Sequence, residues 1–398
     1  MRVLNLLKTS VGASWALRQM RELVNLGVDV HVALPAGGPL VHEYVEAGIS
    51  VHPMQFDFPL SQPWTCPSLF RKLRDLVSEV QPSIIHSHFV GTTLTMRMAL
   101  GKRHAVPRVF QVAGPLHLEH AFFRTAELMT AGSVDNWIGS CRWTGQQYAR
   151  FGISLERLYL SYYGVDLDRF KAGEKGTLRN EIGINSASKI VGMVAYMYAP
   201  KRYLGQTRGL KGHEDLIDAV SICLKEGEDI FCVFVGGAWK GATEYETQVR
   251  AYAKQRLGER AIFLGTRNDV SELYPDFDVV VHPSHSENVG GAAESLLLAV
   301  PTIASEVGGL PDLVRHNETG WLVPPKSPAR LADAILQALR NPRRAHEMAV
   351  AGQQLARELF DVKKTARQVR EIYQAVLSRP EASVPKRTHL EPQGASTV

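Results

Sequence analysis

Two carboxylates on either side of a glycine pair form the part of this sequence best suited to chemistry. The stretch runs from Ser286 to Glu294 and reads Ser-Glu-Asn-Val-Gly-Gly-Ala-Ala-Glu. An apolar run over residues 279–284 predicts a buried strand before it, and the residues after it predict a helix. A strand, a glycine turn and a helix together direct backbone N–H groups at an anion. Because the flanking carboxylates would accept hydrogen bonds from sugar hydroxyls, the stretch predicts a site for a nucleotide-sugar.

Length and composition predict a two-domain protein without nucleic acid as a partner. The chain has 398 residues, of which 45% are hydrophobic, and its net charge is only +5. Such a length exceeds the usual limit of one core, and so small a charge does not indicate a nucleic-acid binder. Four cysteines without a C-x-x-C pair indicate reduced thiols. We find no signal peptide or membrane span and expect a cytoplasmic protein with a disordered tail over 379–398.

Strands and amphipathic helices alternate along both halves of the chain. The first unit is a strand over 2–7, a small-residue turn with Gly12, a helix over 15–26 and a second strand over 28–34. This β-α-β pattern predicts a parallel sheet. We therefore expect two doubly wound, Rossmann-like α/β domains, residues 1–166 and 187–362, which face each other across a cleft. Ligands bind such sheets beyond the carboxyl ends of the strands.

Motifs in both halves resemble the family 4 glycosyltransferases, which have the two-domain GT-B fold. The most specific block covers 279–325 and contains the following motifs: His282-Pro283-Ser284, the pair Glu287 and Glu294, Pro301-Thr302-Ile303-Ala304, Gly308-Gly309-Leu310-Pro311-Asp312, and Gly320-Trp321-Leu322-Val323-Pro324. Upstream, 164–166 looks like the family's G-V-D junction, 211–212 like its lysine-glycine pair and 86–88 like its histidine-rich strand end. The resemblance covers most of residues 1–378.

This resemblance implies a retaining transfer of a sugar from a nucleotide-diphosphate donor to an acceptor hydroxyl. The donor would lie on the C-terminal domain and the acceptor on the N-terminal one. A last helix over 363–378 would pack back on the first domain. The family usually needs no metal, because basic side chains and helix N-termini neutralise the diphosphate, so we expect neither a metal nor another cofactor.

The two glutamates are carried over from the family with one departure. Glu294 matches by its distance to Pro301, and there it would accept hydrogen bonds from the ribose hydroxyls. The family usually places seven residues between the acids, whereas six separate Glu287 from Glu294 here. We favour Glu287 as the residue that faces the donor sugar and stabilises charge at its anomeric carbon. Ser286 or Asn288 is the alternative sugar contact.

A diphosphate leaving group needs positive charge as its bond to the sugar breaks. Lys211 is the family match, but the family's arginine is replaced by Ala195-Tyr196. We expect one of three cations in the insertion that follows to supply the missing charge; these are Lys201, Arg202 and Arg208. Two more contacts with the donor phosphate are expected from Gly290 and Gly291, which allow close backbone approach. Gly12 is predicted either to approach the donor or to serve only as a tight turn.

On the acceptor side, the family's histidine is also missing, because Ala113 stands in its place. His117 is the best substitute for a contact with the transferred sugar. Glu119 is a candidate base for the acceptor, and His120 lies beside it. The alternative for each is a packing or surface role. His86 and His88 are expected to support other residues or to cap a helix.

Three functions are compatible with these residues. The leading one is a glycosyltransferase that builds a surface polysaccharide, an exopolysaccharide or a glycolipid. The alternatives are a nucleotide-sugar epimerase of the same architecture and a partner subunit without catalysis. Lipid-linked acceptors are common in the family, so peripheral contact with the inner face of a membrane is a further expectation.

Overall fold

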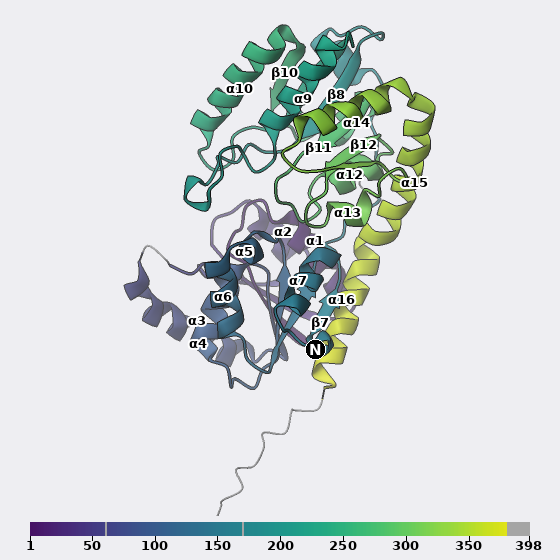
Figure 1. Cartoon of the computed structure of the whole chain (residues 1–398). Helices are drawn as coiled ribbons and strands as arrows, with labels where there is room; N and C mark the ends of the chain where they lie inside the picture. The colour runs from purple at the N-terminus through teal and green to yellow at the C-terminus, as the bar shows by residue number, and fades with distance from the viewer. Residues whose placement is uncertain (60–61, 169–170, 380–398) are drawn as a thin grey trace, which may run out of the picture.

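The computed structural model describes residues 1–59, 62–168 and 171–379, and it divides into two domains that each hold a parallel sheet between helices (Figure 1). The predicted tail lies outside the described residues except for Arg379, which donates a hydrogen bond to Asn136 Oδ1 at 2.9 Å. The two parallel-sheet domains confirm the α/β fold class.

The N-terminal sheet has seven strands in the order β3-β2-β1-β4-β5-β6-β7. Its central strands are buried on both faces, as parallel sheets between helices require. The strands are β1 (Arg2–Leu6), β2 (Asp29–Leu34), β3 (Ser50–Pro53), β4 (Ile84–Ser87), β5 (Arg108–Val112), β6 (Asp135–Gly139) and β7 (Leu158–Leu160). The helices are α1 (Ser14–Asn25), α2 (Leu40–Glu46), α3 (Cys66–Val80), α4 (Val90–Leu100), α5 (Leu116–Glu119), α6 (Ala121–Thr130) and α7 (Arg142–Arg150), with short turns η1 (Pro63–Thr65) and η2 (Leu155–Arg157).

The C-terminal sheet has six strands in the order β10-β9-β8-β11-β12-β13. The strands are β8 (Lys189–Val194), β9 (Ile230–Val235), β10 (Ala261–Gly265), β11 (Val279–His282), β12 (Thr302–Ser305) and β13 (Trp321–Val323). The helices of this domain are α8 (Thr177–Ile182), α9 (His213–Lys225), α10 (Thr243–Leu257), α11 (Val270–Leu273), α12 (Ala292–Leu297), α13 (Leu310–Leu313), α14 (Pro328–Arg340) and α15 (Pro342–Phe360), with turns η3 (Arg202–Leu204), η4 (Gly258–Arg260) and η5 (Tyr274–Asp276). The last helix of the chain, α16 (Val362–Leu377), packs on the N-terminal domain.

Strand order reverses at the centre of each sheet, and these switch points face the space between the domains. In the N-terminal sheet β1 pairs with both β2 and β4, and in the C-terminal sheet β8 pairs with both β9 and β11. The loops that leave β1, β8 and β11 therefore meet where doubly wound folds bind their ligands.

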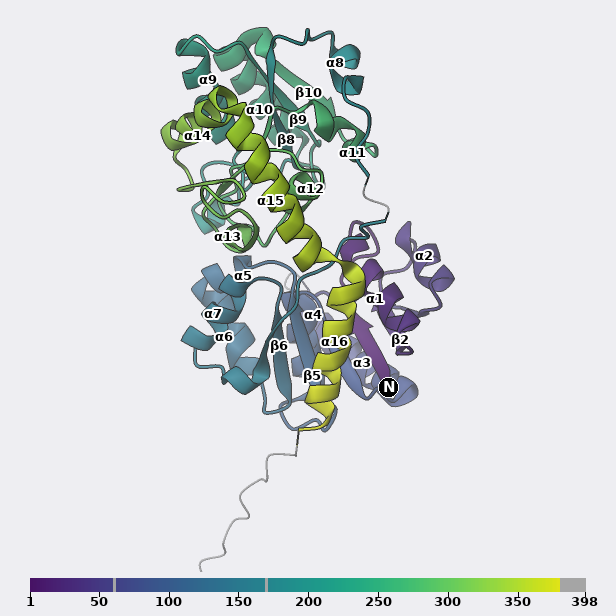
Figure 2. The same ribbon diagram turned by 90° about the vertical axis from the view of Figure 1, so that its right-hand side faces the viewer.

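The last two helices connect the domains again. Figure 2 shows α15 along the C-terminal domain and α16 along the N-terminal one. Val369 and Tyr373 of α16 are fully buried in the apolar core around α1 and β2. The two chain crossings pair with each other, because Val165 N donates to Phe360 O at 2.7 Å and Val362 N donates to Val165 O at 3.1 Å. Both links between the domains therefore lie at one edge of the molecule.

Candidate active site

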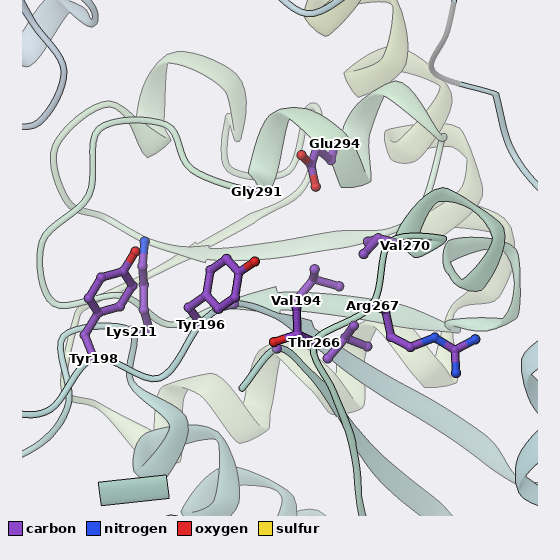
Figure 3. Close-up of a pocket in the computed structure, with 12 residues that line it drawn as sticks. Val194, Tyr196, Tyr198, Lys211, Thr266, Arg267, Val270, Gly291 and Glu294 are labelled. Carbon is purple, nitrogen blue, oxygen red and sulfur yellow. The ribbon is translucent and has the colours of Figure 1, made fainter. Parts of the chain in front are cut away.

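A cavity of about 290 Å³ opens at the carboxyl end of β8, beside the N-terminus of α12. Figure 3 shows Glu294 on one side of it and Tyr196 on the other, with Lys211 and Tyr198 together at one end. Thr266 and Val270 line the opposite end, where the side chain of Arg267 is directed away from Lys211. Ion pairs with Glu181 and Asp269 hold that guanidinium. The cavity therefore has a cationic end and an end with apolar and hydroxyl groups.

Lys211 enters the cavity from the turn before α9. The next residue, Gly212, has φ +76°, and a Cβ there would lie 2.1 Å from Pro283 O. Only glycine fits this position, and it brings the turn against the loop after β11. Lys211 Nζ forms an ion pair with Glu287 Oε2. Burial disfavours the charged lysine, but Glu287 outweighs this effect, and the pKa of Lys211 lies above its ordinary value.

The loop after β11 separates the predicted sugar contacts. Glu287 faces Lys211, and it accepts a hydrogen bond from Asn288 N at 3.1 Å. Gly290 has φ +51°, and a Cβ there would lie 2.7 Å from the Glu287 carboxyl carbon, so the glycine is required for this packing. Ser286 instead points to the N-terminal domain, where Ser286 Oγ donates to Glu119 Oε1 at 2.7 Å.

Asn288 of the same loop has a side-chain oxygen that accepts no hydrogen bond from the described residues. Its Oδ1 atom is buried and has no hydrogen-bond partner among the described residues. Buried polar atoms are nearly always paired, so such an atom is suited to a ligand hydroxyl.

Glu294 lies in the first turn of α12, and its carboxylate lines the cavity. Burial raises its pKa above the ordinary value, against the charge of Arg18 and a hydrogen bond from Tyr274, which both lower it. The Tyr274 hydroxyl lies 3.5 Å from Glu294 Oε2. Gly291, immediately before the helix, also lines the cavity. This end of α12 thus combines a carboxylate with a close backbone approach.

Of the three cations predicted to replace the family arginine, none lines this cavity. Arg208 is held by Asp215 Oδ1 at 2.5 Å and by Asp218 Oδ2 at 2.8 Å, so its contacts favour a structural role over the predicted phosphate contact. Arg202 is exposed in η3. Lys201 is also exposed and lines a second cavity between the domains.

Gly12 packs against the opposite domain. Its φ is +75°, and a Cβ would lie 3.0 Å from the ring of Trp239. That ring belongs to an aromatic cluster, with centroids 4.9 Å from Tyr196 and 5.9 Å from Tyr198. Gly12 therefore makes a tight turn that allows contact with the wall of the cavity, although it does not line the cavity itself.

The predicted acceptor-side residues lie on and beside α5. His117 is buried, and its Nε2 atom lies 3.1 Å from the Tyr148 hydroxyl, so its contacts are those of a packing residue as well as of the second cavity. His120 lines the same cavity. Burial raises the pKa of Glu119, against its hydrogen bond from Ser286. Glu119 thus connects the acceptor side to the donor loop.

The histidine-rich strand end supports the core. His86 Nδ1 lies 2.5 Å from the Tyr373 hydroxyl of α16, and His88 Nε2 lies 3.1 Å from Asn5 Oδ1. Burial lowers the pKa of His88 to about 3, so the ring is neutral.

Three residues of the site were missed by sequence reasoning. Tyr198 lines both cavities, and the Trp239 ring packs beside it at an interplanar angle of 40°. Arg18 lies on α1, yet its charge acts on Glu294 of the other domain. An arginine on an amphipathic helix looks like a surface residue, and only the docking of the two domains gives it this neighbour.

The described residues contain neither a membrane-spanning helix nor a cluster of metal ligands. No described helix is long and apolar enough to cross a membrane. Within the same residues, no group of three or more His, Cys, Asp or Glu side chains is placed to hold a metal ion.

Comparisons with known proteins agree with the fold and the motifs. The D-inositol 3-phosphate glycosyltransferase of Mycobacteroides abscessus is 30% identical over 187 residues, 46% of this chain and 39% of that protein. The N-acetyl-alpha-D-glucosaminyl L-malate synthase of Bacillus anthracis is 26% identical over 201 residues, 50% of this chain and 49% of that protein. The matches thus span about two fifths to one half of these relatives.

The crystal structure of Anabaena HepE in complex with UDP-glucose superposes with a TM-score of 0.79 at 22% identity, covering 94% of this chain and 100% of that one. This likeness confirms the GT-B fold. Residues 13–169 match the family described as Glycosyltransferase Family 4, and residues 202–355 match the family described as Glycosyl transferases group 1. The two matches account for both domains, and they show that the chain belongs to the family 4 glycosyltransferases.

Proposed function

We propose that this protein is a retaining glycosyltransferase that moves a sugar from a nucleotide-diphosphate donor to an acceptor hydroxyl. One observation carries the proposal: Lys211 and Glu294 line a single cavity at the switch point of the C-terminal sheet, and Lys211 is paired with Glu287. A cation for phosphate and a carboxylate for hydroxyl groups are the two requirements of a nucleotide-sugar.

The donor extends along the cavity from Thr266 to Lys211. Its base lies at the end lined by Val194, Thr266 and Val270, and the ribose hydroxyls donate to Glu294. The diphosphate lies at the N-terminus of α12 beside Gly291, where Lys211 neutralises its charge. The sugar then reaches Glu287 and the unpaired amide oxygen of Asn288.

Transfer breaks the bond between the anomeric carbon and the β-phosphate oxygen and forms a bond from that carbon to the acceptor oxygen. The acceptor proton passes to the departing phosphate oxygen, so the acceptor approaches from the face that the diphosphate leaves. Glu287 stabilises positive charge at the anomeric carbon, and Lys211 stabilises the leaving group. Glu119 orients the acceptor from the N-terminal side. No metal or other cofactor enters this scheme, because Lys211 and the helix N-terminus supply the positive charge.

The acceptor is a carbohydrate or a lipid-linked molecule of surface polysaccharide, exopolysaccharide or glycolipid synthesis. The family supports this class, and the two relatives named above glycosylate, according to their names, an inositol phosphate and a malate. We place the protein in the cytoplasm, with peripheral contact at the inner face of the membrane.

The test is a panel of radiolabelled UDP-, GDP- and ADP-sugars with membrane extract as the acceptor source. We expect release of one nucleoside diphosphate together with a labelled product, whose anomeric configuration by NMR matches that of the donor. Conversion of the donor without transfer would identify an epimerase. Absence of binding to every donor would favour a partner subunit without catalysis.

Lys211→Met should lower kcat about a hundredfold or more, because it removes a charge that acts mainly on the leaving group. Lys225→Met is the matched control, since Lys225 is exposed at the far end of the same helix, α9. Equal loss of activity in both variants would show that the effect is not specific to the site.

A further inference from the structure

A second cavity, of about 510 Å³, lies between the two domains and meets the donor cavity at Tyr198, which lines both. Its N-terminal wall follows β4 and β5 and includes Phe89 and Gly114, and its C-terminal wall includes Lys201 and Tyr203. An acceptor in this cavity can present a hydroxyl at Tyr198, beside the Lys211 ammonium, which lies 5.8 Å from the Tyr198 ring centroid.

Six Trp, Phe and Tyr side chains line this second cavity. They come from both domains and comprise Trp15, Phe89, Phe110, Phe123, Tyr198 and Tyr203. Trp15 and Phe89 pack with centroids 5.6 Å apart, so part of the surface is preformed. Phe122, next to Phe123, is 73% exposed, and the two rings lie 5.4 Å apart. The apolar surface therefore continues from the cavity to the outside of the molecule, which suits a ligand with an apolar body.

The charged groups of this surface are all cationic. Lys8 and Lys201 line the cavity, and none of the described residues that line it is a carboxylate. Lys8 Nζ lies 5.0 Å from the centroid of the Phe89 ring. Neither lysine forms an ion pair with a described residue, in contrast to Lys211 and Arg208. Two free ammonium groups beside an apolar surface complement a ligand that carries a negative charge.

Three polar side chains that line this cavity already have hydrogen-bond partners. His88 contacts Asn5 and Tyr163, the latter at 2.8 Å, and His117 contacts Tyr148 at 3.1 Å. The carboxamide oxygen of Gln206 accepts a hydrogen bond from Lys201 N at 2.8 Å, and His120 also lines the cavity. Any sugar hydroxyl that met only aromatic carbon here would be costly to bury, whereas an anion would meet two ammonium groups.

We infer that the acceptor is an anionic amphiphile, with a hydroxyl presented at Tyr198, an apolar body on the aromatic surface and a phosphate or carboxylate read by Lys8 and Lys201. This inference rests on the proposed function, because it names the substrate class that the acceptor side of the same site takes.

Three probes test the inference on the full-length protein, and the two amphiphilic probes are used below their critical micelle concentrations. The probes are decyl phosphate, decyl β-glucoside and inorganic phosphate, with binding measured by calorimetry. We expect decyl phosphate to bind at least tenfold more tightly than either other probe. Equal affinity for the uncharged glucoside would overturn the anionic part of the inference. Equal affinity for inorganic phosphate would overturn the apolar part, since free phosphate would then suffice.

Two variants locate the binding. Lys8→Met with Lys201→Met should weaken decyl phosphate about tenfold and leave the glucoside unchanged, and Lys225→Met is the control. Phe123→Ser should weaken decyl phosphate without changing the binding of inorganic phosphate. A melting curve for each variant verifies its folding. If decyl phosphate binds the variants and the parent protein equally, the cavity is not its site and the inference fails.

The binding of UDP, GDP and ADP is measured in parallel. If a nucleoside diphosphate binds but decyl phosphate binds no more tightly than the other two probes, this inference is overturned and the proposed function still stands. If no nucleoside diphosphate binds but decyl phosphate still binds more tightly than the other two probes, the proposed function is overturned instead.

Discussion

Among the single residues, Glu294 has the most clearly defined environment, because its neighbours influence the charge and the orientation of its carboxylate. Burial raises its pKa, whereas Arg18 and Tyr274 favour the carboxylate that can accept hydrogen bonds. A carboxylate held in this way binds a pair of neighbouring hydroxyls well, since a charged acceptor strengthens each bond. We therefore assign it to donor binding, and the Lys211–Glu287 pair to the reaction.

We predict that Glu294→Gln raises the KM for the donor about tenfold to a hundredfold and changes kcat little, because it removes a charged acceptor for hydroxyls that do not react. Steady-state kinetics over a range of donor concentrations measure the two constants separately. Glu259→Gln, at an exposed position of η4, is the control. A fall in kcat at unchanged KM would move Glu294 from binding to the chemical step.

Some residues of this region could be predicted from the sequence, whereas the contacts of others could not. Glu294 could be found from its spacing to Pro301, and Lys211 from the glycine beside it. The ion pairs of Arg208 could not be predicted, because its partners Asp215 and Asp218 lie on α9, and only the fold turns the loop toward them. The hydrogen bond from Ser286 to Glu119 joins residues far apart in sequence and depends on how the domains dock.

At the scale of elements, a buried charge network holds the N-terminal sheet to the helices that cover it. Arg97 of α4 donates to Asp135 Oδ1 at 2.9 Å and to Glu127 Oε1 at 2.6 Å, and Arg108 of β5 donates to Asp135 Oδ2 at 2.7 Å. All four side chains are buried, with 0–1% of each exposed. Such a network fixes α4 and α6, whose neighbour α5 carries the acceptor-side residues.

Asp135→Asn should lower the free energy of unfolding by about 3–5 kcal/mol, because it leaves two buried guanidinium groups short of a charge partner. Urea unfolding followed by circular dichroism measures the change. Asp75→Asn on the exposed face of α3 should cost less than about 0.5 kcal/mol. Similar stability of the two variants would mean that water reaches the network.

His86 and His88, at the end of β4, make the free energy of unfolding depend on pH. Burial lowers the pKa of His88 to about 3 and also lowers that of His86, whereas both titrate near pH 6.5 in an unfolded chain. Between these values the unfolded chain binds more protons, so the free energy of unfolding falls as the pH drops below about 6.5.

We expect the free energy of unfolding to fall between pH 7.5 and pH 5, by up to about 1.4 kcal/mol per pH unit for each buried histidine, and the urea midpoint to fall with it. His213 and His282, whose pKa values burial lowers to about 4, add to the same slope. A His88→Gln variant should show a shallower slope than the parent protein. Identical midpoints at the two pH values would contradict the buried, neutral state of these rings.

At the scale of the whole molecule, the two parallel-sheet domains could be predicted from repeated β-α-β units, which are local patterns, whereas the strand order within each sheet was not predicted. The contacts across the cleft could not be predicted, because they join surfaces that carry no periodic signal. They include Tyr162 and Arg142 N, which both donate to Asp312 Oδ2 at 2.8 Å, and the packing of Trp239 on Gly12. These contacts bring the donor loop to the acceptor cavity.

The two crossings between the domains pack closely at Gly164, where a Cβ would lie 2.3 Å from Val362 Cα. Gly164→Ala should therefore lower the melting temperature by several degrees and raise the donor KM, because Arg18 donates to Gly164 O at 3.3 Å and would move with it. Gly145→Ala, within α7 and with no atom in reach of the added Cβ, should be neutral or slightly stabilising. Scanning calorimetry and donor kinetics compare the two, and equal behaviour would show that the crossing accommodates a methyl group.

We propose that one cavity of the C-terminal domain holds a nucleotide-diphosphate donor between Glu294 and Lys211. The most direct measurement is a crystal structure with whichever of UDP, GDP or ADP binds most tightly. We predict ribose hydroxyls within hydrogen-bond distance of the Glu294 carboxylate, and the diphosphate beside Lys211 and the N-terminus of α12. A nucleotide bound elsewhere, or one that leaves Glu294 and Lys211 without contacts, would contradict the account.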